Sequence, residues 1–195
     1  MKRDISEFKI DELICPIKLD NANISWELNW SDEVGKITFT IEVTSKDCDN
    51  LYISNVYTAK DHEILRSHKI KHVLSLYPVI LKPEFNQLYI NVYDYSGADI
   101  QQHFDKTYEF IEKHRNNGES VLVHCHVGRS RASTIIINYL MNKNKISFEK
   151  AYNYLKSKRP IIHPNPGFRL QLKKIEKNLL SDTMKNKHLN EIIEK

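Results

Sequence analysis

The sequence predicts an α/β protein in which helices flank a central, mostly parallel, twisted sheet, with a β-hairpin extension at the N-terminus. Three observations support this prediction. From about residue 50, strand-like apolar runs alternate with helical patterns. Two runs of period two precede them. The 195 residues suffice for one well-packed core but not for two. We therefore expect an extension over residues 1–45, one domain over 46–181 and a polar tail over 182–195.

The extension contains two alternating runs on either side of a glycine-containing turn at residues 31–35. This pattern predicts a hairpin over residues 24–43. An isolated hairpin is marginally stable, so it either packs on the domain as an accessory or binds a partner. The apolar positions are Ile24, Trp26, Leu28 and Trp30 in the first run and Ile37, Phe39, Ile41 and Val43 in the second.

The first half of the domain is predicted to contain a strand over residues 87–93. Thr58 and Asp61 resemble a capping box that opens a helix to about Ser67. Asp99, followed three residues later by Gln102, resembles a second cap. The helix after it carries an apolar stripe and has a glycine near its end: Ile100, Phe104, Tyr108, Ile111 and Gly118.

The second half continues the alternation with one strand and three helices. Residues 121–124 have the pattern of a buried strand, and helical spacing follows from Ser133. Ser147 caps the next helix, which ends before Pro160, and Pro166 suits the first turn of the last one. The apolar helix positions are Ile135, Ile136, Leu140 and Met141, then Phe148, Ala151, Tyr152 and Leu155, then Phe168, Leu172, Ile175 and Leu179.

The segment VLVHCHVGRSR, from Val121 to Arg131, is the most informative part of the chain. A tight loop between a strand and a helix leaves backbone N–H groups pointing inward, and such a ring binds a tetrahedral anion. The same field favours a thiolate at Cys125. Arg131 adds a planar fork for two phosphate oxygens, and Gly128 permits the tight turn. The segment therefore predicts a site in which a thiolate attacks phosphorus.

Two plainer interpretations of this segment fit less well. Cys125 could be a structural cysteine beside a surface arginine, but such a cysteine does not need the loop around it. His124, Cys125 and His126 could bind a metal, but consecutive strand residues point to opposite sides. No second Cys/His pair stands at zinc spacing elsewhere in the sequence. We expect no metal in the site and no cofactor.

Composition sets broad limits. The net charge of +4 suits phosphorylated substrates without implying nucleic acid, and no nucleic-acid partner is expected. No stretch approaches the roughly 18 apolar residues that span a bilayer, and the first residues lack an apolar signal core. Three cysteines, at positions 15, 48 and 125, form an odd and sparse set. They predict a reducing compartment, the cytoplasm and also the nucleus.

The segment from Val121 to Arg131 resembles the active-site motif of the dual-specificity subfamily of cysteine-based protein tyrosine phosphatases, in a small, atypical form. The resemblance runs from about residue 50 to 180. Residues 51–55 resemble the opening strand, although Ser54 stands where the family usually has glycine, and residues 70–75 resemble the next strand. Residues 159–168 are similar to the family's late loop, which steadies the phosphate cradle. The resemblance implies a protein tyrosine phosphatase-like domain, with Asn165 as a supporting residue.

The leaving oxygen needs a general acid, and Asp94 and Asp99 are the candidates. Asp94 directly follows a strand, in a loop that could cover the pocket. Asp99 is better explained as a helix cap. In the family the acid lies in this loop, about thirty residues before the nucleophile, so the resemblance favours Asp94.

The expected mechanism uses Cys125 as nucleophile while Asp94 gives a proton to the leaving oxygen. A phosphocysteine forms, and Asp94 then activates the water that hydrolyses it. His124 orients the loop or is merely a buried strand-end histidine. The phosphate oxygens are held by Arg131 and by the N–H groups of the loop residues His126, Val127, Gly128, Arg129, Ser130 and Arg131.

Two features depart from the family pattern. Ala132 stands where the family usually has a serine or threonine whose hydroxyl helps the sulfur leave. Ser133 lies about 100° further round the helix and should not substitute. Phosphatases of regenerating liver resemble this chain in carrying alanine here, so the alanine does not exclude activity. Without the hydroxyl, a slow hydrolysis step is expected. The basic loop residues His126 and Arg129 resemble those of phospholipid phosphatases, or Arg129 is a solvated surface charge.

These patterns predict a dual-specificity protein phosphatase that acts on phosphotyrosine and phosphoserine/phosphothreonine. The partner is a phosphoprotein substrate, with a kinase as one candidate. One alternative is a phosphatase for phosphoinositides or other small phosphate esters. Another is a phosphate-binding scaffold with little turnover. Cys125, Arg131 and Asp94 argue against the scaffold, while Ala132 keeps it open.

Overall fold

The computed structural model describes residues 30–31, 36–37, 40–43, 50–177 and 179. At its centre is a five-stranded sheet in the order β3-β4-β7-β5-β6. Strands β4, β7, β5 and β6 are parallel to one another, and β3 pairs antiparallel with β4. The predicted mostly parallel sheet is confirmed. Its strands are β3 Thr40–Val43, β4 Leu51–Ser54, β5 Ile70–Ser75, β6 Asn86–Tyr89 and β7 Ser120–His124.

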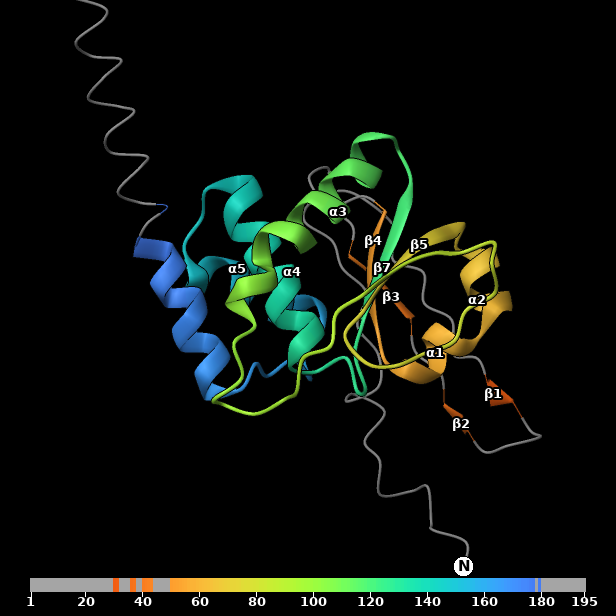
Figure 1. Ribbon diagram of the computed structural model, residues 1–195, viewed down its shortest axis with the longest axis horizontal. Helices are drawn as coiled ribbons and strands as arrows, with labels where there is room; N and C mark the ends of the chain where they lie inside the picture. The colour runs from red at the N-terminus through yellow and green to blue at the C-terminus, as the bar shows by residue number, and fades with distance from the viewer. Residues whose placement is uncertain (1–29, 32–35, 38–39, 44–49, 178, 180–195) are drawn as a thin grey trace, which may run out of the picture.

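Helices cover both faces of the sheet (Figure 1). The short helices α1 Val56–Lys60 and α2 His62–Ser67 lie on one face. None of the helices in the described residues has the length and apolar composition that a membrane crossing requires. The other face carries the 3-10 helix η3 Gln101–His103, α3 Phe104–Asn116, α4 Arg131–Asn144, α5 Phe148–Lys158 and a helix over residues 166–177.

The core is divided by the sheet into two clusters. Leu51, Ile53 and Val123 point into the larger cluster, together with residues of α3, α4 and α5. The intervening Tyr52 and Leu122 point into the smaller cluster, together with residues of α1 and α2. Because the central strands bury both faces, their sequences are almost continuously apolar.

The helix expected between Thr58 and Ser67 is two helices, so the predicted capping box is wrong. Asn55 caps α1, since its Oδ1 accepts a hydrogen bond from the N–H of Thr58 at 2.9 Å. Asp61 caps α2 by accepting from the N–H groups of residues 63 and 64 at 3.0 and 3.1 Å. Asp61 has extended backbone angles (φ −85°, ψ 97°), so one continuous helix cannot pass through it.

The other boundaries mostly follow the prediction. Asp99 accepts from the N–H of Gln102 at 3.2 Å, and Ser147 accepts from the N–H of Lys150 at 3.3 Å. The strand expected over residues 87–93 begins at residue 86 and ends at Tyr89. The residues that follow run as an irregular segment, which brings Asp94 to the site described below.

The N-terminal hairpin is described only in part. β1 Trp30–Ser31 pairs antiparallel with β2 Lys36–Ile37, as the sequence predicts. Residues 24–29, Phe39 and the predicted tail over 182–195 lie outside the described residues. β3, expected in the second hairpin strand, pairs instead with β4 in the central sheet. β3 thereby pairs with backbone N–H and C=O groups of β4, which would otherwise be exposed at the edge of the sheet.

Candidate active site

Strand β7 carries Cys125 to the carboxyl end of the parallel sheet, where ligand sites of α/β proteins usually lie. His124 ends the strand, residues 126–130 form a loop, and α4 begins at Arg131. Cys125 is buried, and the backbone N–H of Gly128 donates to its Sγ at 3.2 Å. The local pattern of strand, tight loop and helix is therefore the one that the sequence predicts.

The loop turns its carbonyl groups away from its centre. All four carbonyls of residues 126–129 accept hydrogen bonds from outside the loop. Arg159 donates to the middle two, through Nη2 at 3.3 Å and Nε at 3.1 Å. The N–H of Val56 donates to the first at 3.1 Å, and that of His163 to the last at 2.8 Å. Because a trans peptide points its N–H opposite to its C=O, this arrangement directs the next N–H groups inward.

Gly128 is required at the tightest point of this loop. Its φ is +72°, a region that side chains disfavour. A Cβ atom here would lie 2.5 Å from the carbonyl oxygen of Ser54 and 3.0 Å from Nη2 of Arg159. Glycine therefore lets β4 and Arg159 approach the loop backbone closely.

Arg131 is anchored by one end of its guanidinium group. Its Nη1 donates to the carbonyl oxygens of Leu76 at 2.8 Å and Val92 at 3.2 Å. Its Nε is buried and has no hydrogen-bond partner among the residues that the structure describes. Nε lies 3.6 Å from Oδ2 of Asp94. A buried donor without a partner is costly, so this atom is suited to bind an anion placed beside the loop.

The family model described as the catalytic domain of dual specificity phosphatases matches residues 51–178 of the sequence. The chain belongs to the dual-specificity phosphatase family. Members of this family are hydrolases that act on phosphate esters. The match covers the central strands from β4 onward and the helices on both faces, together with the loop around Cys125.

Individual relatives agree with this assignment. Dual specificity protein phosphatase 1 of Arabidopsis thaliana is 36% identical over 133 residues, which are 66% of this chain and 67% of the relative. Dual specificity protein phosphatase 15 of Mus musculus is 38% identical over 130 residues, which are 66% of this chain and 55% of the relative. The matched segment thus spans from about half to two thirds of these two proteins.

Solved structures share the fold. The crystal structure of DUSP15 superimposes with a TM-score of 0.63 at 34% identity and covers 70% of this chain and 94% of its own. The crystal structure of human DUSP28 gives 0.65 at 29% identity, over 69% of this chain and 93% of its own. The phosphatase domain therefore accounts for nearly all of each of these crystallised chains.

The structure brings Asp94 to the phosphatase loop. Its Oδ1 accepts hydrogen bonds from Oγ of Ser130 at 2.6 Å and from Nδ2 of Asn165 at 2.9 Å. The N–H of Asn165 donates to the same Ser130 hydroxyl oxygen at 3.2 Å. Asp99 instead contacts Gln102 as a cap. Of the two candidate acids, Asp94 is the one that contacts the loop and approaches Arg131.

The helix over residues 166–177 holds the segment that carries Asp94. Asn165 caps this helix through Oδ1 while its Nδ2 contacts Asp94. A Cβ atom on Gly167 would lie 1.8 Å from the carbonyl oxygen of Ser96, so only glycine allows this approach. Gln171 accepts from two N–H groups at the start of η3 at 3.0 and 2.8 Å. These contacts place Asn165 between Asp94 and the start of the last helix.

Both ring nitrogens of His124 have hydrogen-bond partners beneath the loop. Its Nε2 is 2.8 Å from Oγ of Ser75, and its Nδ1 is 3.4 Å from the carbonyl oxygen of Cys125. Gln87 donates to the same Ser75 oxygen at 2.8 Å. Burial lowers the pKa of His124 to about 4, so the ring is neutral at neutral pH. A neutral ring donates from one nitrogen and accepts at the other, and these contacts fit a proton on Nδ1.

The residues after Arg131 agree with the expectation drawn from the sequence. Ala132 is fully buried and carries no hydroxyl. Oγ of Ser133 donates to the carbonyl oxygens of Arg129 at 2.6 Å and Ser130 at 2.8 Å. Its hydroxyl therefore turns back along the helix and does not replace the missing one.

Sequence reasoning did not single out two residues of the site. Arg159 begins the segment 159–168 that resembles the family's late loop; it is 3% exposed and holds two loop carbonyls, but nothing in its spacing connects it with Cys125. Tyr77 stacks on His126 with ring centroids 4.7 Å apart, and its ring centroid lies 5.7 Å from Cζ of Arg131. Tyr77 follows β5 by two residues, so the convergence of parallel strand ends could have indicated it.

Proposed function

We propose that this protein hydrolyses phosphotyrosine and phosphoserine/phosphothreonine in protein substrates through a phosphocysteine on Cys125. The observation that carries the proposal is the loop around Sγ, in which four successive carbonyls are held outward. Nε of Arg131, which makes no hydrogen bond to the described residues, adds a charged donor. Inward N–H groups and a guanidinium group stabilise the charge that develops on the equatorial phosphate oxygens.

The reaction has two displacements. In the first, the Cys125 thiolate attacks phosphorus in line, the bond from phosphorus to the leaving oxygen breaks, and Asp94 gives that oxygen its proton. In the second, water attacks the phosphocysteine and gives a proton to Asp94. The sulfur–phosphorus bond breaks, which restores the thiolate and releases inorganic phosphate.

The neighbouring residues serve this cycle by position. Ser130 and Asn165 both donate to Asp94 and hold its carboxyl group beside the loop. Arg159 keeps the loop carbonyls turned away from the phosphate. His124 remains neutral and supports the strand end through Ser75, so it adds no charge of its own beneath the thiolate.

Basic side chains beside the loop favour a second candidate, an inositol phospholipid phosphatase. The pKa of Lys156 is lowered, first by burial and then by the nearby charges of Arg129 and Arg169. His163 lies within reach of the same charges, and its pKa is also lowered, mainly by burial. Such a group attracts substrates with more than one negative charge. The family assignment supports the phosphoprotein substrate more strongly.

A substrate panel tests the proposal. We expect phosphotyrosine and phosphothreonine peptides to be hydrolysed with higher kcat/KM than short-chain phosphatidylinositol phosphates. Rapid quenching and mass spectrometry should find a phosphate adduct on the peptide that contains Cys125. Higher kcat/KM for the lipids would favour the second candidate. Intact protein that binds phosphopeptide but releases no phosphate would support the scaffold interpretation.

A further inference from the structure

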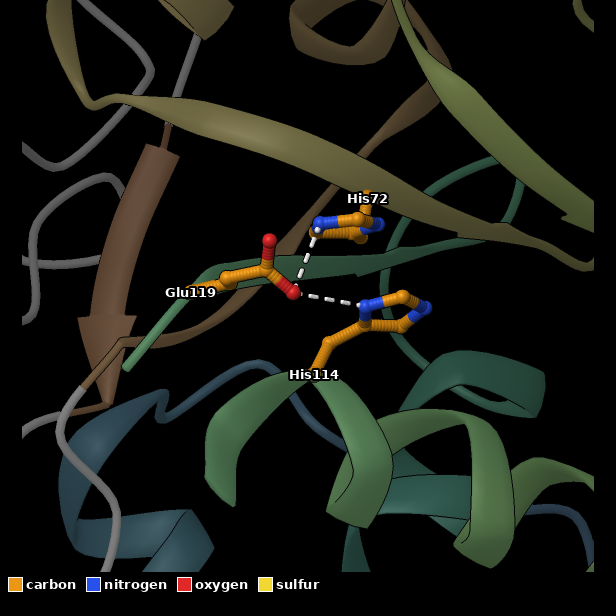
Figure 2. Close-up of side chains that lie close together, drawn as sticks. All are labelled: His72, His114 and Glu119. Atoms are coloured by element: carbon orange, nitrogen blue, oxygen red, sulfur yellow. Dashed lines mark hydrogen bonds and ion pairs between the residues drawn. The ribbon is translucent and has the colours of Figure 1, made fainter. Parts of the chain in front are cut away.

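Three side chains that bind metals in other proteins meet at the amino end of the sheet, opposite to the loop of Cys125. Figure 2 shows His72 from β5, His114 from the last turn of α3 and Glu119 just before β7. Oε2 of Glu119 lies 3.2 Å from Nε2 of His72 and 2.9 Å from Nδ1 of His114. One ligand atom of each residue lies within 4.8 Å of the others.

The remaining ring nitrogens both face one amide group. Nδ2 of Asn86 is 3.1 Å from Nδ1 of His72 and 3.3 Å from Nε2 of His114. A half-turn of this amide would place its oxygen there, and that oxygen can accept two hydrogen bonds. Histidines that bind metals typically donate their other N–H to such an acceptor. Asn86 can therefore orient both rings with their lone pairs toward Glu119.

The distances are close to those of a zinc site. Ligands at about 2.05 Å from a tetrahedral Zn²⁺ are about 3.3 Å from each other. Nε2 of His72 is buried and faces Oε2 of Glu119 at 3.2 Å. The two rings are stacked with centroids 3.5 Å apart, so a shared ion would require them to tilt until both nitrogens point at it. The side chain of Glu119 is 36% exposed, which gives an ion access from solvent.

The backbone holds His114 and Glu119 together before any ion binds. The N–H of Glu119 donates to the carbonyl oxygen of His114 at 3.0 Å, and Gly118 between them has a φ of +73°. The C-terminus of α3 favours a positive charge at this point.

We propose that His72, His114 and Glu119 bind one Zn²⁺ ion, with the fourth coordination position open to solvent. The ion would link β5, the end of α3 and the start of β7. The ion takes no part in phosphoryl transfer. The five residues of β7 separate it from the loop around Cys125, which lies on the order of 13 Å further along the strand. Its role is structural, as a clamp between α3 and the sheet.

The test uses the full chain with Cys125→Ser, because the thiolate at the cradle could itself bind zinc. The protein is freed of metal and titrated with Zn²⁺ by calorimetry and with Co²⁺ by visible absorption. We expect one ion per chain, a higher Tm with Zn²⁺, and the visible bands of tetrahedral Co²⁺. Glu119→Gln and His114→Gln should each weaken zinc binding by at least about tenfold, while Glu109→Gln and His103→Gln should not.

Substitutions of Asn86 distinguish a metal site from a hydrogen-bond network that binds no metal. Asn86→Asp should tighten zinc binding, since a carboxylate accepts from both ring N–H groups, and Asn86→Ala should weaken it by about 10–100-fold. If the Cys125→Ser protein binds no Zn²⁺, or binds it equally well with Glu119→Gln and with His114→Gln, the proposal is overturned. The cluster then only joins α3 to the sheet by hydrogen bonds.

Discussion

The two ends of strands β5 and β7 carry two different clusters of polar side chains. At the carboxyl end, Cys125 and Arg131 stand on one loop between a strand and a helix. At the amino end, His72, His114 and Glu119 come from three elements. The first cluster arises from local backbone geometry and is readable in eleven consecutive residues. The second depends entirely on how the elements pack.

This difference predicts that the two ends respond independently to substitution. The largest effect should come from Cys125→Ser, which should remove turnover, because the loop does not ionise a serine hydroxyl as it does a thiol. The zinc titration at the amino end should stay intact in the same protein. Phosphatase assays and calorimetry on one preparation check both. Retention of more than a small fraction of parent activity would refute the nucleophile assignment.

The second effect concerns acid stability at the carboxyl end. Burial lowers the pKa of His124 from its ordinary 6.5 to about 4, so the unfolded chain takes up this proton more readily than the native one. The contribution of neutral His124 to the free energy of unfolding is complete above pH 6.5. It is lost as the pH falls toward 4, by about 3 kcal/mol in all. Denaturant unfolding across this range should show a shallower acid loss in His124→Gln. Equal slopes in parent and variant would contradict this account.

The third effect distinguishes the two aspartates. Asp94→Asn should lower the turnover of substrates with poor leaving groups by about a hundredfold or more, because the acid is lost. Asp99→Asn is the matched control and should change little, since asparagine also caps helices. Steady-state rates on aryl phosphates of graded leaving-group pKa measure both. The reverse ranking would transfer the acid role to Asp99.

The smallest effect is expected at Ala132. Without a hydroxyl to assist the departing sulfur, breakdown of phosphocysteine should be slow, and a rapid optical assay should show a burst close to one product per enzyme. Ala132→Ser should shrink the burst and raise the steady rate, with little change in stability at a helix start. Linear progress without any gain from serine would mean that another group, such as Ser130, already serves the thiolate.

The secondary structure followed from the sequence wherever local signals agreed. The strand before Cys125 and the helix from Ser147 both combine an apolar pattern with a clear end signal. The sequence failed where two local options competed. Thr58 and Asn55 can both cap a helix, and only the extended backbone at Asp61 decides for two short helices. β3 pairs with β4 in the central sheet, a partner that no local pattern indicates.

The motif indicates the contiguous loop from 126 to 131, and the family resemblance indicates Asp94 and Asn165. The structure places these two side chains in contact, at 2.9 Å. Arg159 was not predictable as the residue that turns two loop carbonyls outward, because its position depends on how α5 and the following turn pack against the loop. A distant partner leaves no signal in local spacing.

The sequence by itself determined the order of the main elements and the succession of strand, tight turn and helix around Cys125, because apolar periodicity and a glycine at the turn are local signals. Tertiary structure alone decided the cluster at the amino end. Ile70 and Val73 both pack in the smaller core cluster, and the pairing of β5 with β7 is irregular between Ile70 and His72. A bulge of this kind reverses the alternation of faces, and it turns His72 toward α3, where His114 and Glu119 lie.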